Sequence, residues 1–314
     1  MIFRSRIIPF LFVIFLTGLN YYLLGFYIKG DQTYYRLLYS TFSETNYRDI
    51  FFVAIPIIGS SEPFTLTILW LGTQLGIEKD LYISLYNFLL LIGLWLFCRQ
   101  NKSGVLILFL IFTNYYIVVL MTSAERLKFA FILITYAFVF FDKKWIRSIF
   151  LISSILAHFQ SALFLLGLGA YRALANKVII SSRISISGLF IKLISILFVC
   201  IISYYFYDNI SHKLIVYLGN GDIYSLLKPL ILFIVSLLSL KSYWSSIKIF
   251  IVMSPLFYIF GDNRMTMVYF LVLFYFLGIE GRLKRPAFLV LMAYFSVKSI
   301  GYVTNIFSFG TGFV

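Results

Sequence analysis

The stretch IIPFLFVIFLTGLNYYLLGF, residues 7–26, carries no charged side chain, and it decides the class of fold. An α-helix needs about 20 apolar residues to cross the hydrocarbon core of a membrane, so this stretch is long enough to span it. Arg4 and Arg6 precede it, and it lacks the small-residue cleavage pattern of a secretory signal peptide. We therefore expect a retained first transmembrane helix.

The rest of the chain has the same apolar character. Of its 314 residues, 61% are hydrophobic, 20% are aromatic and only 12% are charged, whereas about a quarter of a soluble domain is charged. This composition excludes secreted, nuclear and nucleic-acid-binding proteins. It predicts an all-α polytopic integral membrane protein with a single transmembrane domain over residues 1–314. Cys98 and Cys200 lie in apolar runs without metal-type spacing, so we expect neither a disulfide framework nor a zinc site. We also expect no cofactor.

Apolar runs recur along the chain and predict about nine full transmembrane helices. Several runs are shorter than the roughly 20 residues of a full crossing, so their helices must extend into the flanking residues. The nine runs are residues 7–26, 81–98, 105–121, 127–141, 186–206, 226–240, 247–260, 265–279 and 287–306.

The distribution of basic residues orients these helices, because short loops rich in Lys and Arg stay on the cytoplasmic side. The net charge of +14 is therefore a topology signal. Ten of the twelve acidic residues fall in the outer segments of this topology, which supports it because acidic residues were not used to derive it. The N-terminus and loops 99–102, 143–147, 241–248 and 282–285 are cytoplasmic, which places loops 27–80, 122–126, 207–225 and 261–264 outside.

Residues 145–170 cannot be a simple span in this topology. The basic run 172–183 that follows them is also cytoplasmic, so the segment must leave that side and return to it. We expect a short helical hairpin over residues 145–170 with His158 at its outward apex.

A second segment, residues 51–77, also makes no net crossing. Pro56, Gly59 and Glu62-Pro63 interrupt its apolar pattern, and proline suits the first turn of a helix. We expect a re-entrant or interfacial helix near Glu62–Ile77, within the outer loop 27–80.

The positions of the charges restrict the class of function. The middles of the predicted helices are nearly free of charge and the two halves show no internal repeat, which disfavours a secondary transporter. A channel would need a polar stripe that these helices lack. The sequence therefore predicts a polar chamber at the outer face.

Two arginines lie at predicted helix starts on that face. In MTSAERLK, residues 121–128, Thr122 or Ser123 can cap a helix that begins near Arg126, and in GDNRM, residues 261–265, Asp262 or Asn263 can do the same before Arg264. A helix N-terminus with a guanidinium favours a phosphate or diphosphate. Both arginines are therefore candidates for a diphosphate clamp.

The neighbours of Arg126 decide whether it is free for a ligand. Glu125 and Lys128 are three residues apart and share a helix face, which predicts that they pair and leave Arg126 unpaired. The alternative is that Arg126 pairs with Asp31, Glu62 or another outer acid.

An ordered set of motifs resembles the EpsG-type Wzy polysaccharide polymerases. The set is GDQTYY at residues 30–35, Glu62-Pro63-Phe64, Arg126 at a helix start, AHFQSA at 157–162, and Arg264 before a tyrosine-rich helix. Lys128 is not part of that pattern. The resemblance implies an integral-membrane glycosyltransferase of the bacterial inner membrane. Such an enzyme joins undecaprenyl-diphosphate-linked repeat units at the periplasmic face, without a nucleotide sugar or a metal.

His158 is the candidate general base, because histidine exchanges a proton near neutral pH and glycosyl transfer requires an acceptor hydroxyl to lose one. The alternative is a structural tip whose imidazole hydrogen-bonds Ser161 or Gln160. Arg126 and Arg264 would hold the diphosphate. Asp31 and Glu62 either bind acceptor hydroxyls or neutralise the arginines. Further substrate-binding candidates are Tyr34 and Tyr35, which could equally be interfacial anchors, and Lys128 and Gln160.

The expected partners are the lipid-linked oligosaccharide and membrane lipid, with a chain-length regulator as a further candidate. Three rival functions remain open. An O-antigen ligase would differ only in its acceptor, and a flippase or exporter would move the same lipid. An acyltransferase would need a cytoplasmic acyl-CoA entry that an outward chamber does not provide.

Overall fold

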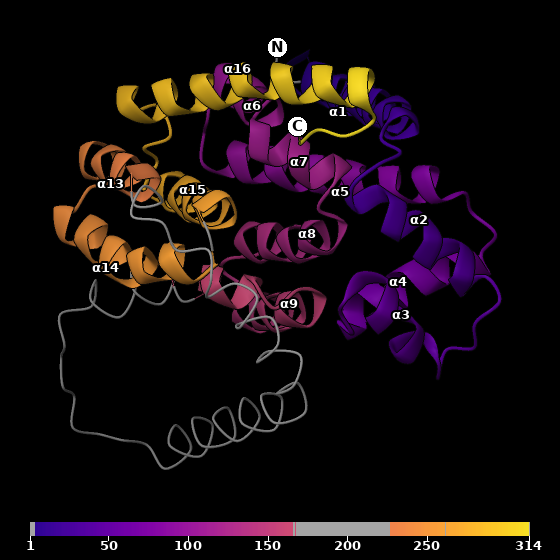
Figure 1. Cartoon of the computed structure of the whole chain (residues 1–314). Coiled ribbons are helices and arrows are strands. Elements are labelled where there is room, and N and C mark those ends of the chain that lie inside the picture. Colours follow the sequence, from indigo (N-terminus) through magenta and orange to yellow (C-terminus); the bar gives the residue numbers. More distant parts are fainter. Residues whose placement is uncertain (1–3, 166, 168–226, 261, 314) are drawn as a thin grey trace. The chain divides into compact units, whose positions relative to one another are not determined.

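The computed structural model describes residues 4–165, 167, 227–260 and 262–313 (Figure 1). Every element in these residues is an α-helix. The predicted helix 186–206 and the predicted outer loop 207–225 lie outside the described residues. The helices are α1 (Arg4–Phe26), α2 (Asp31–Phe42), α3 (Ile50–Ile58), α4 (Pro63–Gln74), α5 (Lys79–Gln100), α6 (Val105–Phe112), α7 (Tyr115–Thr122), α8 (Glu125–Val139), α9 (Lys144–Ala157), α13 (Leu227–Ser239), α14 (Tyr243–Phe260), α15 (Asp262–Ile279) and α16 (Pro286–Phe309).

The number of spans differs from the sequence prediction. Three helices in the described residues are long and apolar enough to cross a membrane, namely α1 from Ile7, α5 and α16. The count rises to five if two bent pairs, α3 with α4 and α6 with α7, each form one span. These helices fit a helical membrane protein, but nine full spans were too many for the described part of the chain.

Short helices account for the difference. α8 has 15 residues and α13 has 13, which corresponds to about 20 Å at 1.5 Å per residue, less than the roughly 30 Å of a bilayer core. The predicted helix 105–121 is divided because Asn114 caps α7, where its side chain accepts a hydrogen bond from the backbone N–H of Tyr116 at 3.0 Å. α6 and α7 meet there at a bend of 49°.

The predicted outer loop 27–80 contains three helices, α2, α3 and α4, where the sequence predicted only the last. α3 ends at Gly59, whose φ of 61° lies in the left-handed region that favours glycine. α4 begins at Pro63, which needs no backbone N–H there. α3 and α4 meet at a bend of 104°, so they do not form one straight rod.

The chain divides into two compact units. Unit 1 comprises Met1–Leu165 and Phe274–Val314, and unit 2 comprises Leu166–Leu273. Within unit 1, α5 packs against α1 and α8, and α9 packs against α8 (Figure 1). In the same unit α2, α3 and α4 contact one another, and α4 also contacts α5 and α9. Within unit 2, α13 packs against α14.

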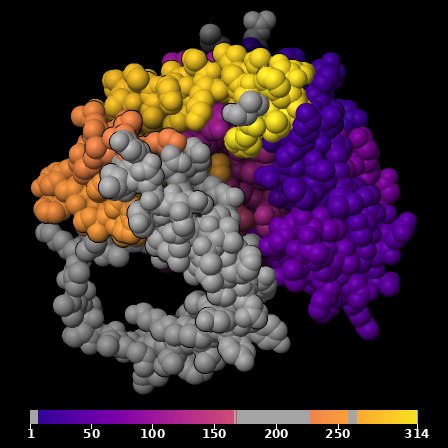
Figure 2. Space-filling view, in the orientation of Figure 1, coloured from indigo at the N-terminus to yellow at the C-terminus, as the bar shows by residue number. Residues whose placement is uncertain are grey.

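The last helix of unit 1 lies against the N-terminal segments (Figure 2). The rings of Phe26 in α1 and Phe307 in α16 are 4.9 Å apart. The carbonyl of Gly310, just after α16, accepts the backbone N–H groups of Ile28 at 3.1 Å and Lys29 at 2.9 Å. These contacts hold the short connection from which α2 begins.

α16 also presents an apolar stripe to its surroundings. Its outer side chains recur at helical spacing, and each is at least 60% exposed: Val290, Tyr294, Val297 and Ile300. A stripe of this kind is unfavourable in water and suits contact with lipid tails.

Candidate functional site

α2 sends polar side chains into unit 1 along one face. Its buried residues recur at helical spacing: Gln32, Tyr35, Leu38, Tyr39 and Phe42. Asp31 and Tyr34 are exposed, with Tyr34 at 55%. The structure therefore brings Tyr35 inward and leaves Asp31 and Tyr34 on the outer face of the same helix.

Glu62 is the centre of a polar cluster in the break between α3 and α4. Its side chain is 1% exposed. Its Oε2 accepts a hydrogen bond from Arg126 Nη1 at 3.0 Å, and its Oε1 lies 2.8 Å from His158 Nδ1. We call Tyr35, Glu62, Arg126, His158 and Gln160 the Glu62 cluster, and all five are residues that the sequence had selected.

The position of His158 follows from the end of α9. That helix stops at Ala157, and His158 is its C-cap, with an extended backbone. Thr65 in the first turn of α4 donates a buried hydrogen bond to the carbonyl of Ala157 at 2.7 Å. This bond ties the start of α4 to the end of α9, which places the imidazole beside Glu62. Residues 161–165 of the second arm of the predicted hairpin are helical, and residues 166 and 168–170 lie outside the described residues.

Arg126 lies in the first turn of α8. One prediction left it unpaired, but the structure gives it two partners. Besides its bond to Glu62, its Nε donates to the hydroxyl of Tyr35 at 3.1 Å. The alternative prediction, pairing with Glu62, describes the contact. The side chain is still 21% exposed, and within the described part of the chain no acceptor pairs with Nη2. That edge of the guanidinium can therefore meet a ligand.

The two nitrogens of His158 have different partners. Nδ1 faces the Glu62 carboxylate, which fixes a proton there in the neutral ring. Nε2 lies 3.2 Å from Gln160 Oε1. Turning the Gln160 amide by half a rotation presents an N–H to Nε2 and satisfies the neutral imidazole. Nε2 is the atom available to take a proton.

Charges and burial set the ionisation of this cluster. Burial opposes ionisation of Glu62, but the charges of His158 and Arg126, with their hydrogen bonds, outweigh it and hold its pKa well below the usual range. Burial raises the pKa of Tyr35 to about 12, against the opposing charge of Arg126. At neutral pH, Glu62 is therefore a carboxylate and Tyr35 a neutral phenol.

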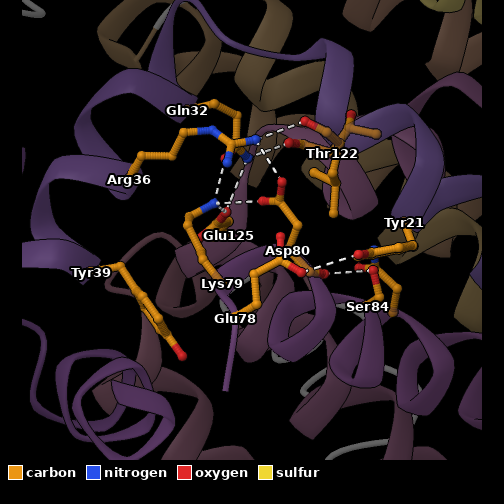
Figure 3. Close-up of polar contacts among 12 residues, drawn as sticks. Tyr21, Gln32, Arg36, Tyr39, Glu78, Lys79, Asp80, Ser84, Thr122 and Glu125 are labelled. Carbon is orange, nitrogen blue, oxygen red and sulfur yellow. Dashed lines mark hydrogen bonds and ion pairs between the residues drawn. The ribbon is translucent and has the colours of Figure 1, made fainter. Parts of the chain in front are cut away.

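A second buried cluster adjoins the first at the start of α8 (Figure 3). Lys79 Nζ lies between Glu125 Oε1 at 2.7 Å and Gln32 Oε1 at 2.6 Å. The Gln32 amide donates to the same Glu125 oxygen at 3.0 Å and to the carbonyl of Thr122. Arg36 donates to Asp80 Oδ2 at 2.7 Å. We call Gln32, Arg36, Lys79, Asp80 and Glu125 the Lys79 network.

This network corrects the predicted pairing of Glu125 with Lys128. Glu125 is fully buried and takes the ammonium of Lys79 from α5, a neighbour across the helix interface. Lys128 is also fully buried, and its Nζ donates to the carbonyl of Met121 at 3.1 Å. Side chains three apart on a helix meet at its solvated surface, whereas both of these point into the protein.

The predicted cap of α8 was also wrong. The N-cap is Ala124, which has no side-chain oxygen. The hydroxyls of Thr122 and Ser123 donate instead to the carbonyls of Val118 at 2.8 Å and Val119 at 3.1 Å, at the end of α7. Hydroxyls near a helix end commonly satisfy that helix rather than the next one.

Buried carboxylates stand at the N-termini of three helices of unit 1. Glu62 is the N-cap of α4, and Asp80 and Glu125 lie in the first turns of α5 and α8. Negative charge is favourable there because the helix dipole is positive at its N-terminus. Arg126, Lys79 and Arg36 balance these carboxylates, so the region combines high polarity with little net charge.

Gln32, Arg36, Lys79 and Asp80 were not predicted from the sequence as parts of a site. One signal was present, because Gln32 interrupts a stripe of otherwise aromatic and aliphatic residues on α2. Another was Lys79-Asp80 directly before an apolar run. In the described residues, no group of three or more His, Cys, Asp or Glu side chains could hold a metal ion.

Arg264 lies in the first turn of α15, in unit 2, and its side chain is outside the part that the structure describes. The predicted clamp of two arginines therefore remains a prediction. Comparison of the chain with known protein families, with curated proteins and with solved structures finds no match.

Proposed function

We propose that this protein is a membrane-embedded glycosyltransferase that polymerises oligosaccharide repeat units linked to undecaprenyl diphosphate, like the EpsG-type Wzy polymerases. The contact of Glu62 with both His158 and Arg126 is the observation that supports it best. A carboxylate that holds one imidazole nitrogen prepares the other as a base. We place the reaction at the periplasmic face of a bacterial inner membrane, with a chain-length regulator as a candidate partner.

The proposed reaction is a single displacement. An acceptor hydroxyl oxygen attacks the anomeric carbon of the donor, and the bond from that carbon to the diphosphate oxygen breaks. The hydroxyl proton passes to His158 Nε2, and Glu62 stabilises the imidazolium that forms. The leaving diphosphate takes the bonding electron pair, and the exposed edge of Arg126 meets its negative charge.

Other residues have supporting roles in this proposal. Gln160 covers Nε2 until an acceptor hydroxyl replaces it, and Tyr35 orients Arg126 through the 3.1 Å bond to Nε. The exposed Asp31 and Tyr34 contact sugars that lie above α2. Lys128 supports α8 from within without touching substrate.

The test is elongation by the purified full chain, reconstituted in lipid, from lipid-linked repeat units. His158→Asn keeps a side chain that can hydrogen-bond Glu62 but offers no base, so elongation should fall by about a hundredfold to ten-thousandfold. Binding of the donor should be retained, since donor binding depends on Arg126. His212→Asn, at the only other histidine of the chain, is the matched control and should elongate normally.

The same assay separates the rival functions. Elongation by His158→Asn near the wild-type rate would exclude the histidine as base. Product formed only on an added second acceptor, with no self-polymerisation, would identify a ligase. Transbilayer movement of the donor without any product would identify a flippase.

A further inference from the structure

Two helix ends of unit 1 meet at a cavity whose lining includes no residue of the Glu62 cluster. After α5, the backbone N–H groups of Ser103 and Lys102 bond to the carbonyls of Cys98 at 2.9 Å and Arg99 at 3.1 Å. After α15, those of Arg282 and Gly281 bond in the same way to the carbonyls of Leu277 and Gly278. Both turns are Schellman motifs. The cavity between them has a volume of about 300 Å³ and is lined by Asn101, Lys102, Ser103, Gly281, Leu283 and Lys284.

The residue at the left-handed position differs between the two turns. After α15 this position is Gly281, with a φ of 68°, as is usual. After α5 it is Lys102, with a φ of 51°, and it is the one non-glycine residue with positive φ in the described part of the chain. A lysine is strained there, whereas a glycine is not. The fold thus tolerates strain and gains a lysine side chain at the cavity.

The cavity is strongly basic. Residues 99–103 and 280–285 contain five basic residues and one acid, Glu280, an excess of four positive charges. Two helix C-termini contribute only about one negative charge together, so the field stays positive. The aliphatic part of Lys284 lies 3.8 Å from the position that a Cβ on Gly104 would occupy, which places this lysine across the first turn.

One polar group at the cavity lacks a strong partner. The buried hydroxyl of Ser103 has no nitrogen or oxygen partner among the described residues and lies beside the Cys98 thiol. The Asn101 amide donates one N–H to the carbonyl of Phe97 at 2.8 Å, which leaves its second N–H. Two ammonium groups, the Ser103 hydroxyl and this N–H are donors that suit a ligand with several acceptor oxygens. A phosphate has that chemistry.

The cavity lies at the end of α5 and just before the start of α16, both of which are long and apolar enough to span a membrane. Its level is therefore that of lipid headgroups. Gly278 keeps the helix ends together, since a Cβ there would lie 2.3 Å from the ring of Phe97. A preformed basic cavity at this level can take a headgroup phosphate.

We propose that this cavity binds one phosphate group, supplied by the headgroup of an anionic phospholipid or by a free phosphate. The proposal does not depend on the glycosyltransferase function. It differs from general attraction to an anionic membrane because it requires one defined site with Lys102 and Lys284 as its cations.

The experiment measures ligands retained by the full chain. Protein purified from vesicles that contain phosphatidylglycerol and phosphatidylcholine is examined by native mass spectrometry for retained phosphatidylglycerol. In parallel, binding of inorganic phosphate is measured by calorimetry on delipidated protein in detergent. Each lysine removed should weaken binding about fivefold, and Lys102→Gly with Lys284→Gln together roughly 25-fold.

The variants separate binding from folding. Lys102→Gly removes the backbone strain, so its melting temperature should equal or exceed that of the wild type while binding falls. Lys284→Gln tests the same site at an exposed residue outside the left-handed position. Lys144→Gln, at an exposed lysine at the start of α9, is the matched control and should bind as the wild type does.

Retained phosphatidylglycerol without phosphate binding would identify lipid as the source, and phosphate binding alone would identify a soluble ligand. Wild-type retention of both ligands by the Lys102→Gly, Lys284→Gln double variant would overturn the proposal. An equal loss in Lys144→Gln would overturn it as well, because the effect would then be one of net charge.

Discussion

Glu62 is the residue on which the candidate site depends, because two cationic or cation-forming partners share its carboxylate. Arg126 binds one oxygen and His158 faces the other, and the carboxylate is almost completely buried. A buried charge with both oxygens occupied is held in one orientation, and it holds its partners in turn. Glu62 therefore determines where both the base and the guanidinium lie.

Glu62→Gln tests this dependence. The amide has nearly the same shape but no charge, so it leaves the partly buried Arg126 without its counter-ion. Breaking a buried pair from one side costs about 3 to 5 kcal/mol, and we expect a clearly lower melting temperature in detergent. Glu44→Gln, at an exposed glutamate, is the control and should melt like the wild type. An unchanged melting temperature for Glu62→Gln would contradict the buried pair.

The difference in melting temperature between wild type and Glu62→Gln depends on pH with a definite sign. The pKa of Glu62 is depressed in the folded protein, so its stabilisation is complete above the ordinary value of 4.5. It is lost only as the pH falls below that value through the folded pKa. The difference in melting temperature between wild type and Glu62→Gln should thus shrink as the pH falls below 4.5.

Helix α4 carries Glu62 at its N-terminus, and its position depends on close packing further along. Gly72 in α4 lies directly against Tyr39 of α2 and Tyr82 of α5. A Cβ there would lie 2.5 Å from the Tyr39 hydroxyl oxygen and 2.6 Å from the Tyr82 ring, distances that real contacts do not allow. Both tyrosines are also fixed by hydrogen bonds, to the carbonyls of Ile77 and Ile68, each at 2.9 Å.

Gly72→Ala should therefore displace α4. Overpacking of this kind costs about 1 to 3 kcal/mol, and any shift of α4 moves Glu62 away from His158. We expect a lower melting temperature together with slower elongation. Gly18→Ala is the matched control, since nothing lies within 4 Å of a Cβ at that helical glycine, and it should leave both measurements unchanged. Equal behaviour of the two variants would show that α4 adjusts without cost.

α5 relates the two polar regions of unit 1 to the membrane. The Lys79 network lies at its first residues, and the basic cavity lies just after its last. Its 22 residues correspond to about 33 Å, the thickness of a bilayer core. If α5 spans, the candidate site and the basic cavity open on opposite faces. The bias of basic loops then predicts that the cavity faces the cytoplasm and the candidate site faces the outside.

Labelling of single cysteines in intact cells tests this topology. In a background with Cys98 and Cys200 replaced by alanine, a membrane-impermeant thiol reagent should modify Tyr34→Cys and should miss Lys102→Cys. Both positions are exposed in the structure, so access to the side chain is not limiting. Permeabilised cells serve as the control, and both variants should react there. Modification of Lys102→Cys in intact cells would reverse the orientation.

Individual residues show how far sequence reasoning reached into the site. Arg126 and His158 could be selected because an ionisable side chain in an apolar chain is costly and so stands out. Pairing with Glu62 could only be offered as one option for Arg126, because Arg126 and His158 lie 64 and 96 positions along the chain from Glu62. The pairing of Glu125 was predicted wrongly, because its true partner Lys79 is 46 residues away on another helix.

The amino-acid sequence alone determined the helical, membrane-embedded class, since composition and the apolar run 7–26 follow from hydrophobicity without knowledge of contacts. It also determined the start of α4 at Pro63, which is a local property of the backbone. Only the tertiary structure decided where apolar runs break into short helices and which charges neutralise each other. Those outcomes depend on the distances between side chains from different helices, and buried charges take whichever partner the packing brings within a hydrogen bond.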